Sequence, residues 1–581
     1  MSIPLDASVG ADRPSRVSPF SALLSPYAIG AMVLAACAVT LTLHVTLPVG
    51  PMYWDLFVYV DGGWRVLTGQ MPSVDFFTPV GPLGYWLYAA AMTLFPDGHP
   101  LLLAQWMLMP VTLTALLPVL AWIDKRSRRL ALALLLPFLV FQLLPTNVEQ
   151  YSTFPAIDGF GIYNRHMTQI LYVLTVALVF ERRQRMLFFV IAWTCAALFL
   201  TKITGFICAG MLCAFAFAAG RVQFRTALAA LLAFALVLAG LEAAFGVVSA
   251  YVQDILTLVR LNENIILVRF IQASSLHFGV VGTGALLLLA LLWVDRKGLV
   301  AAASNAVRQP LQGARWAALF DRDVLWLGVA LFVGIFCETQ NTGSQAFIFL
   351  WPILLRIACN ASLHSTRATT AILVLVAAVA MPPIVNVVHR TSRALVVQIK
   401  YDHVPLEELR ALDTVSQRTE MTERADKMLL HYSRFPEAYQ ALADMKELPT
   451  FWLYSDLDFQ SGWMTSTNDA VREIRAYEAA HNVRFETIMS LNFTNVFPYA
   501  MERRATPYIA IGADPFRAVP PASARTTEAV RQTDLIMMPL CPITVANEML
   551  HDVYREGMKD HVRVSLSPCW DAYIRPDLAN R

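Results

Sequence analysis

Long uncharged, apolar stretches recur between positions 27 and 388 of this chain, and no other feature limits its fold as strongly. A helix needs about 20 apolar residues to cross the hydrocarbon core of a bilayer. Charged residues make up only 15% of the 581 residues, whereas soluble globular chains carry about 25%. The sequence therefore predicts an α-helical polytopic membrane protein.

About eleven membrane-spanning helices are expected before position 389. The apolar segments that qualify are 27–48, 100–122, 130–145, 168–181, 187–201, 204–219, 226–248, 279–295, 323–337, 346–359 and 368–388. The first 26 residues are polar, and no short apolar region with a cleavage site follows them. We therefore expect no removable signal peptide.

The loops between these segments differ in basic charge. Before position 389, one side of the membrane receives eighteen Lys and Arg residues, and the other receives only Arg65, Arg165, Lys202, Arg260 and Arg269. Cytoplasmic loops carry the excess of Lys and Arg, so the N-terminus is predicted to be cytoplasmic. An odd number of spans then places residues 389–581 outside, in the periplasm if the membrane is the inner membrane of a Gram-negative cell.

Lys202 interrupts the apolar stretch 187–219, and this position decides the orientation of everything after it. We interpret Thr201–Gly205 as a turn near the outer face with a helix on each side. A single long helix would move the later basic loops outside, against the charge rule.

The loops predicted to lie outside, 50–98, 146–167 and 249–278, are large and rich in aromatic and ionisable residues. In the first, residues 54–68 fit a short helix ended by Gly69 and Pro72. Asp55, Tyr59 and Gly62 share one face of that helix, whereas Asp61 points elsewhere and is expected to be solvated or structural. A second apolar helix is expected to begin at Pro82.

This first loop resembles a known family. An Asp directly after the first span, a Tyr four residues later, a Gly-x-x-Pro turn (69–72), Asp75-Phe76 and Gly81-Pro82-Leu83-Gly84-Tyr85-Trp86 are similar to the first periplasmic loop of GT-C glycosyltransferases. That superfamily includes aminoarabinose transferases and protein O-mannosyltransferases. The resemblance implies transfer of a sugar from a polyprenyl-phosphate carrier to an acceptor on the outer side of the membrane. Many members carry an acidic pair where this chain has Asp55-Leu56, so a single-Asp variant fits better and a divalent cation is one option.

The candidate site residues follow from this chemistry. An acceptor hydroxyl must lose its proton as it attacks the anomeric carbon, and one carboxylate can act as the general base. We assign that role to Asp55, with Asp75 as a second catalytic carboxylate that contacts acceptor or donor, and Tyr59 beside them. The leaving phosphate needs fixed positive charge. Its candidates are Lys202, Arg165, His166, Arg260 and Arg269, with Glu338, Gln340 and Asn341 placed to face the sugar.

Two other functions stay open. The chain could polymerise or ligate lipid-linked glycans, or it could be a transporter or flippase of lipid-linked sugars. A transporter is expected to show related halves, and the sequence has no internal repeat. The expected partners are a polyprenyl-phosphate sugar, a lipid, glycan or protein acceptor, and the membrane. A net charge of +2 gives no reason to expect nucleic acid, and no metal-ligand spacing is present.

Residues 389–581 are charged and polar and predict a soluble α/β domain. Helical stretches are expected within 404–447. The expected strands are 450–455, 484–490, 507–512, 534–539 and 562–566, and the expected helices are 467–481, 525–532 and 543–557. Strands alternating with helices favour a parallel sheet. If 534–539 and 562–566 are neighbouring parallel strands, Cys541 and Cys569 emerge at one edge and come within bonding reach.

Overall fold

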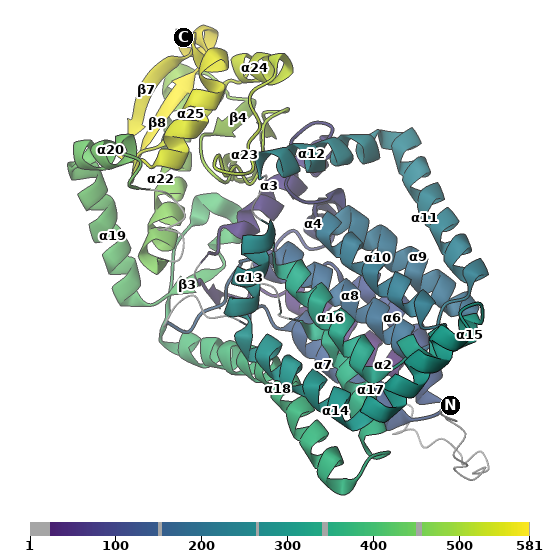
Figure 1. Cartoon of the computed structure of the whole chain (residues 1–581). Coiled ribbons are helices and arrows are strands. Elements are labelled where there is room, and N and C mark those ends of the chain that lie inside the picture. The colour runs from purple at the N-terminus through teal and green to yellow at the C-terminus, as the bar shows by residue number, and fades with distance from the viewer. Residues whose placement is uncertain are drawn as a thin grey trace.

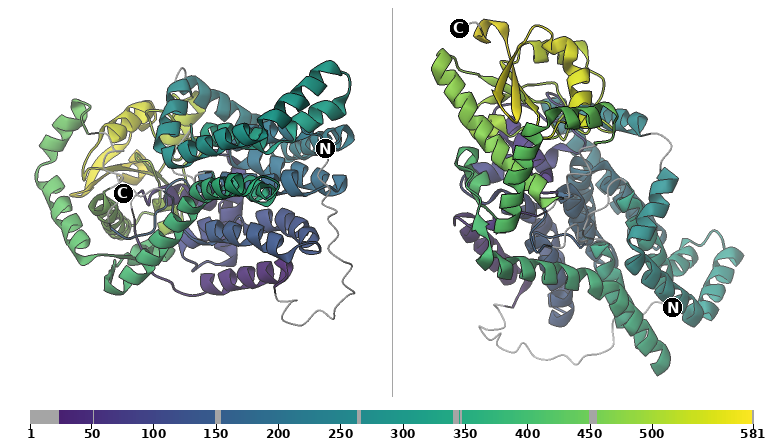
Figure 2. Two further views of the ribbon diagram at one scale, coloured as in Figure 1. Left: turned by 60° about the horizontal axis from the view of Figure 1, so that its bottom comes forward. Right: turned by 90° about the vertical axis from the view of Figure 1, so that its left-hand side faces the viewer.

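The computed structural model describes residues 24–50, 52–148, 154–262, 266–339, 345, 347–448 and 456–579. A bundle of helices extends to Lys400, and an α/β domain projects from one end of the bundle (Figure 1). Two further views show the same arrangement (Figure 2).

The bundle consists of helices of very different length. They are α2 (Pro26–Leu41), α3 (Asp55–Leu67), α4 (Pro82–Leu94), α5 (Pro100–Trp106), α6 (Met109–Asp124), α7 (Arg128–Leu143), α8 (Ile162–Phe180), α9 (Gln184–Thr201), α10 (Ile203–Ala218), α11 (Phe224–Phe245), α12 (Val247–Leu261), α13 (Ile266–Leu276), α14 (Phe278–Arg308), α15 (Gly313–Phe320), α16 (Asp323–Glu338), η1 (Ile348–Leu350), α17 (Trp351–Ala361), α18 (Thr366–Val397) and η2 (Gln398–Lys400).

Each of the segments expected to span the membrane overlaps a helix of this bundle. Within the described residues, five helical stretches are long and apolar enough to cross a membrane: Pro100–Asp124, Gln184–Thr201, Phe224–Phe245, Phe278–Arg308 and Thr366–Lys400. Pro26–Leu41, Ile203–Ala218 and Ile348–Ala361 are shorter apolar helices. These helices make the chain a membrane protein, and the count of eleven spans stays a prediction.

Basic residues from separate loops meet at one end of the bundle. Arg126 and Arg183 both lie over the ring of Trp122, at 3.8 and 5.0 Å from its centroid. Arg221 and Arg356 both pair with Asp321, directly after α15. This end lies opposite α12 and the α/β domain (Figure 1). The arrangement agrees with the expectation that these basic loops share one side of the membrane.

The α/β domain contains a five-stranded mixed sheet of order β5-β4-β6-β8-β7. Strands β5 (Arg504–Ala505), β4 (Thr487–Ser490) and β6 (Leu535–Pro539) are parallel, whereas β8 (Trp570–Ile574) is antiparallel to β6 and to β7 (Val562–Ser567). Around the sheet lie η3 (Glu407–Asp413), α19 (Thr419–Arg434), α20 (Pro436–Asp444), α22 (Leu457–His481), α23 (Phe497–Met501), α24 (Ala524–Arg531), α25 (Val545–Met558) and α26 (Pro576–Ala579).

Two expectations about the strands are wrong, and one expected strand falls in the part of the chain that is not described. The 507–512 segment is not a strand of the sheet; its Ala510 forms a single parallel bridge with Phe77 of the first outer loop. The 534–539 and 562–566 strands are not parallel neighbours, because β8 lies between them. Segment 450–455 falls in the part of the chain that is not described.

The first outer loop and the α/β domain share one hydrophobic core. Strand β1 (Leu47–Pro48) pairs in parallel with β3 (Val415–Gln417), which also pairs with β2 (Asp402–His403). Phe77 donates its N–H to the Ile509 carbonyl and accepts from the Ile511 N–H, both at 3.0 Å. The domain is thus fixed to the loop by main-chain hydrogen bonds as well as by apolar contact.

Arg65 connects the two parts from inside this core. Its Nε donates to the Asp61 carboxylate at 2.8 Å, and its Nη1 donates to the Thr506 carbonyl at 2.7 Å. The Arg65 side chain is fully buried and that of Asp61 is 3% exposed. Asp61 was expected to be solvated or structural, and its burial and its pair with Arg65 show that it is structural.

Replacing Arg65 by Ala is expected to destabilise the protein by about 3–5 kcal/mol, because Asp61 is left as an uncompensated buried charge. Denaturant unfolding of the purified protein measures the change. Arg531→Ala is the matched control, since Arg531 forms an exposed pair with Glu528, and it should change stability by less than about 0.5 kcal/mol. Equal stability of the two variants would refute the assignment.

Cys541 and Cys569 form a disulfide with a Cα–Cα distance of 4.8 Å. The bond is confirmed, but the geometry that produces it is different from the expected one. Cys541 follows the end of β6, and Cys569 immediately precedes β8. Since β6 and β8 are antiparallel, with Pro539 opposite Trp570, the end of one strand lies beside the start of the other.

Thiol labelling of the purified protein should leave Cys541 and Cys569 unmodified until a reductant is added. Cys359 is free and exposed, so it should react without reductant and report that the reagent works. Labelling of both Cys541 and Cys569 before reduction would contradict the bond, which needs an oxidising compartment to persist.

Candidate functional site at the outer end of the helical bundle

Asp55 begins helix α3, where an acidic side chain is favoured by the helix dipole. Its side chain is buried, with 8% exposure. The carboxylate accepts a hydrogen bond of 3.0 Å from the N–H of Gly161, the residue before α8. Burial raises the pKa of Asp55 to about 6, against the opposing influence of the Gly161 hydrogen bond and of Arg517 and Arg165. A carboxyl group with this pKa is suited to accept a proton near neutral pH.

The predicted face of α3 packs against helices α4 and α8. The ring centroid of Tyr59 lies 5.8 Å from that of Tyr85 and 6.3 Å from that of His166. At Gly62, an added Cβ would lie 2.2 Å from the ring of Tyr85. A larger residue there would push α3 away from α4, so Gly62 sets the position of the helix that carries Asp55.

Lys202 lies at the break between α9 and α10, which confirms the predicted hairpin. Its side chain is 7% exposed. The ammonium donates to the Asn164 side-chain oxygen and lies 5.0 Å from the ring centroid of Tyr163. Asn164 and Tyr163 belong to the first turn of α8, so the same turn that binds Asp55 through Gly161 also holds Lys202.

The motif around Gly81 closes on this hairpin. The Gly81 N–H donates to the Thr201 carbonyl at 3.0 Å. An added Cβ on Gly81 would lie 2.2 Å from the Leu200 carbonyl oxygen, so only glycine allows this approach. The Gly-Pro-Leu segment thus places the first outer loop directly against the Lys202 turn.

Arg165 and His166 were expected to lie with Lys202 as phosphate-binding candidates, but their contacts are elsewhere. Arg165 is fully buried; it pairs with Asp158 and donates to the side-chain oxygens of Asn147 (3.0 Å) and Gln105 (3.2 Å). Arg390 also pairs with Asp158, so this network ties the second outer loop to α18. His166 is 1% exposed and packs edge-on against Tyr59. Both residues therefore support the site from inside the protein.

The two arginines of the third outer loop, Arg260 and Arg269, lie in different surroundings. Arg260 is exposed on α12. Arg269 of α13 donates to the Asn262 side-chain oxygen at 3.3 Å. Burial and the nearby Arg517 guanidinium lower the pKa of Arg269. Arg269 therefore lies toward the site, and Arg260 does not share these contacts in the part of the chain that the structure describes.

Asp75 lies in the first outer loop with its carboxylate accepting a 2.8 Å hydrogen bond from the Met71 N–H. Its carbonyl accepts from the Tyr508 N–H of the α/β domain. The Asp75 carboxylate closes its own turn, so the structure places it as a support of the loop.

Two ionisable residues at this end were not predicted from the sequence. Arg517 of the α/β domain interacts electrostatically with Asp55 and Tyr163, and nothing in its local sequence marks it. Asp254 of α12 is buried and accepts from the Thr78 N–H at 3.4 Å, and burial raises its pKa to about 7. A lone acid in an amphipathic helix was the signal that could have found Asp254.

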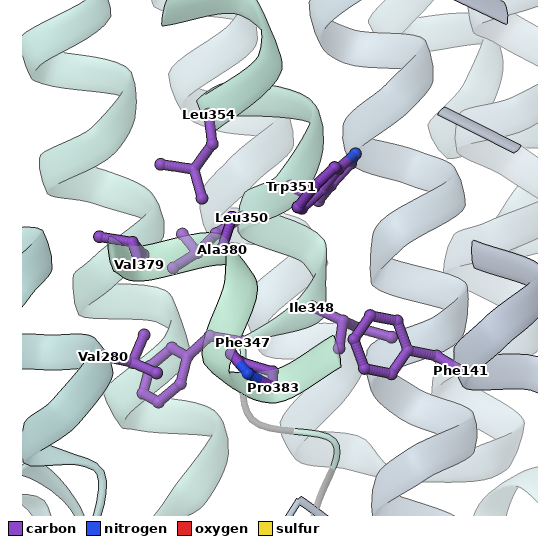
Figure 3. Close-up of a pocket in the computed structure, with 10 residues that line it drawn as sticks. All are labelled: Phe141, Val280, Phe347, Ile348, Leu350, Trp351, Leu354, Val379, Ala380 and Pro383. Atoms are coloured by element: carbon purple, nitrogen blue, oxygen red, sulfur yellow. The ribbon is translucent and has the colours of Figure 1, made fainter. Parts of the chain in front are cut away.

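Below these polar groups the bundle contains a small apolar pocket. Its lining side chains converge from α7, α14, the η1–α17 segment and α18 (Figure 3). Phe347, one of them, lies edge-on to His277 with ring centroids 5.5 Å apart. His277 in turn lies 3.3 Å from the Glu338 carboxylate, and Glu338 interacts electrostatically with Lys202. Gln340 and Asn341, also expected near the sugar, lie outside the described residues.

Metal-ligating groups do not cluster here: the described residues contain no group of three or more His, Cys, Asp or Glu arranged to hold an ion. The site therefore consists of a buried carboxylate, a buried lysine and nearby arginines.

No protein-family model matches this sequence, and no curated protein sequence matches it. Among solved structures, the chain is similar to the crystal structure of ArnT from Cupriavidus metallidurans in the apo state. The TM-score is 0.35 and the identity 12%, with 95% of this chain and 99% of that chain covered. The resemblance to GT-C enzymes therefore rests on the residues of the first outer loop.

The pKa of Asp55 makes a prediction that is independent of activity. Because the folded-state pKa of about 6 exceeds the ordinary value of 3.8, the stability that protonated Asp55 supplies is present at low pH and is lost as pH rises through 6. Asp55→Asn should therefore match the wild type near pH 4 and become progressively more stable than it up to about pH 6. Unfolding curves across this range measure the difference.

The control is Asp97→Asn, which changes an exposed acid of the same outer loop. A substitution at such an exposed position should change stability by less than about 0.5 kcal/mol. If Asp55→Asn behaved like Asp97→Asn, the carboxylate would be solvated and the assignment of a buried base would fail.

Proposed function

We propose that this chain is a GT-C-type glycosyltransferase that moves a sugar from a polyprenyl-phosphate carrier to an acceptor at the outer, periplasmic face of the inner membrane. One observation carries the proposal: the first turn of α8 holds a buried carboxylate through Gly161 and a buried lysine through Asn164. A proton acceptor and a phosphate-binding cation are the two groups that this reaction needs.

In the proposed reaction, Asp55 removes the proton of an acceptor hydroxyl while the hydroxyl oxygen attacks the anomeric carbon of the donor sugar. The bond between that carbon and the phosphate oxygen breaks, and the polyprenyl phosphate leaves with the electron pair. Lys202 and Arg269 stabilise the negative charge on the departing phosphate. Burial of Asp55 and Lys202 strengthens these electrostatic interactions relative to water.

The other expected residues take supporting roles in this proposal. Tyr59 packs against His166, Arg165 holds the second outer loop, and Asp75 closes the turn that meets the α/β domain. Arg260 is exposed on α12 and is not assigned to the phosphate.

The apolar pocket supports a lipid-linked donor. Its lining residues are apolar or aromatic, and one of them, Phe347, packs against His277 (Figure 3). Contact of a polyprenyl chain with this apolar surface would be favourable, because it removes the surface from water. The acceptor is a lipid, a glycan or a protein, and a panel of acceptors with radiolabelled polyprenyl-phosphate sugars would identify it.

Asp55→Asn is expected to abolish sugar transfer in such an assay, since the amide cannot take the proton. For the wild type, kcat/KM should fall about tenfold per pH unit below pH 6, where Asp55 becomes protonated. Asp97→Asn serves as the control and should retain full turnover. Near wild-type turnover by Asp55→Asn would eliminate Asp55 as the base.

Lys202→Ala is expected to raise the KM for the polyprenyl-phosphate sugar. A hydrogen bond to a charged group contributes about 1.5–3 kcal/mol, which corresponds to roughly ten- to a hundred-fold. Initial rates at varied donor concentration measure the effect, with the exposed Lys400 replaced by Ala as the control. Unchanged donor kinetics in Lys202→Ala would mean that the lysine only extends toward the membrane surface.

A further inference from the structure

The loop that follows the Ala510 bridge brings the α/β domain to the candidate site. Gly512 has a φ of +56°, and an added Cβ there would lie 3.5 Å from Val58 of α3. Ala513 donates its N–H to the Phe493 carbonyl at 3.1 Å, and Phe493 packs on Trp54, the residue before Asp55, at 5.1 Å between ring centroids. The loop is therefore built onto the start of α3.

The far side of this loop is tied to the third outer loop. The side-chain nitrogen of Asn262 donates to the Arg517 carbonyl at 2.9 Å, and the side-chain oxygen of Asn262 accepts from Arg269 at 3.3 Å. One asparagine thus holds the main chain of Arg517 and the guanidinium of Arg269. This arrangement places two arginines from distant parts of the sequence on the same side of the site.

Three cations consequently share this end of the molecule. Arg517 interacts electrostatically with both Lys202 and Arg269. Like charges held near one another are costly unless an anion lies between them. Lys202 and Arg269 are hydrogen-bonded to the neutral amides Asn164 and Asn262, so these contacts leave their positive charge uncancelled.

Arg517 differs from the other two because it has a carboxylate partner in its own loop. Its Nε lies 2.7 Å from the Asp514 carboxylate, and its side chain is 50% exposed. The anionic groups facing the cluster are Asp514 beside Arg517, Asp55 at the start of α3 and Glu338 at the end of α16. An exposed pair of this kind contributes little to stability, so Arg517 can exchange Asp514 for a stronger anion.

We propose that Arg517 is the residue by which the α/β domain binds the phosphate of the lipid-linked donor, together with Lys202 and Arg269. The donor site is then complete only when this domain is docked on the first outer loop. A guanidinium presents paired N–H donors that match the oxygens of a phosphate. This inference rests on the proposed function and assigns to it a residue from outside the bundle.

The first test measures binding without turnover. The full-length protein in detergent is titrated with polyprenyl phosphate, with uncharged polyprenol and with inorganic phosphate. Wild-type protein should bind polyprenyl phosphate more tightly than polyprenol. Arg517→Ala should lower the affinity for polyprenyl phosphate by roughly ten- to a hundred-fold and leave the affinity for polyprenol unchanged.

Two variants separate phosphate binding from a structural role. Arg517→Lys keeps the charge and should recover part of the lost affinity. Arg531→Ala removes an exposed arginine of the same domain and should bind like the wild type. Equal affinity of Arg517→Ala and wild type for polyprenyl phosphate would overturn the inference, as would a loss of polyprenol binding of the same size.

The second test is kinetic and distinguishes the two proposals. In the sugar-transfer assay, Arg517→Ala should raise the donor KM by roughly ten- to a hundred-fold. The fall of kcat/KM at low pH that Asp55 causes should still be measurable in this variant. Wild-type protein that binds polyprenyl phosphate through Arg517 but transfers no sugar would overturn the proposed function and uphold the role of Arg517. Normal transfer by Arg517→Ala with unchanged donor KM would do the reverse.

Discussion

The structure depends on how the first outer loop finds hydrogen-bond partners for its main chain and for its buried charged side chains. A loop enclosed between apolar helices and a second domain cannot leave its polar groups unpaired, because each costs free energy when buried. The α/β domain supplies the missing partners. Its main chain pairs with that of Phe77. The Arg503 carbonyl accepts a hydrogen bond from the Trp64 indole N–H, and the Thr506 carbonyl accepts one from the Arg65 guanidinium. The loop and the domain therefore form one unit, although more than 400 residues separate them in the sequence.

This docking explains why the acid at the start of α3 has a raised pKa. The aromatic residues Trp54, Phe57 and Tyr59 are covered by α4, α8 and the α/β domain, so Asp55 loses most of its contact with water. Desolvation raises its pKa into the range where proton transfer is efficient. The same enclosure brings Arg517 to a site that would otherwise contain only residues of the bundle. The same contact thus shields Asp55 from water and brings the positive charge of Arg517 to this end of the molecule.

Local sequence patterns predicted the parts of the site that depend on local geometry. The face formed by Asp55, Tyr59 and Gly62 follows from helical spacing alone, and the turn at Lys202 follows from the positive-inside rule applied to the later basic loops. Both agree with the structure. The membrane helices could be located for the same reason, since their apolar length is a property of each segment.

Features that depend on distant partners could not be predicted in this way. Arg165 resembled a free cation at a loop edge, but its acceptors come from Gln105, Asn147 and Asp158 on other segments. Segment 507–512 has the composition of a strand, yet it pairs with Phe77 in place of the sheet. Arg517 comes to this end of the molecule only through the fold, because the sequence does not indicate which arginine will interact electrostatically with Asp55.

The central claim is that Asp55 and the cations around Lys202 face one lipid-linked sugar at the outer end of the bundle. A cryo-electron microscopy structure of the full-length Asp55→Asn variant with a polyprenyl-phosphate sugar tests it most directly. We expect density for the phosphate in contact with Lys202 and Arg517, the anomeric carbon on the side of residue 55, and hydrocarbon density leading toward Phe347. A donor bound at the opposite end, near Trp122 and Asp321, would contradict it.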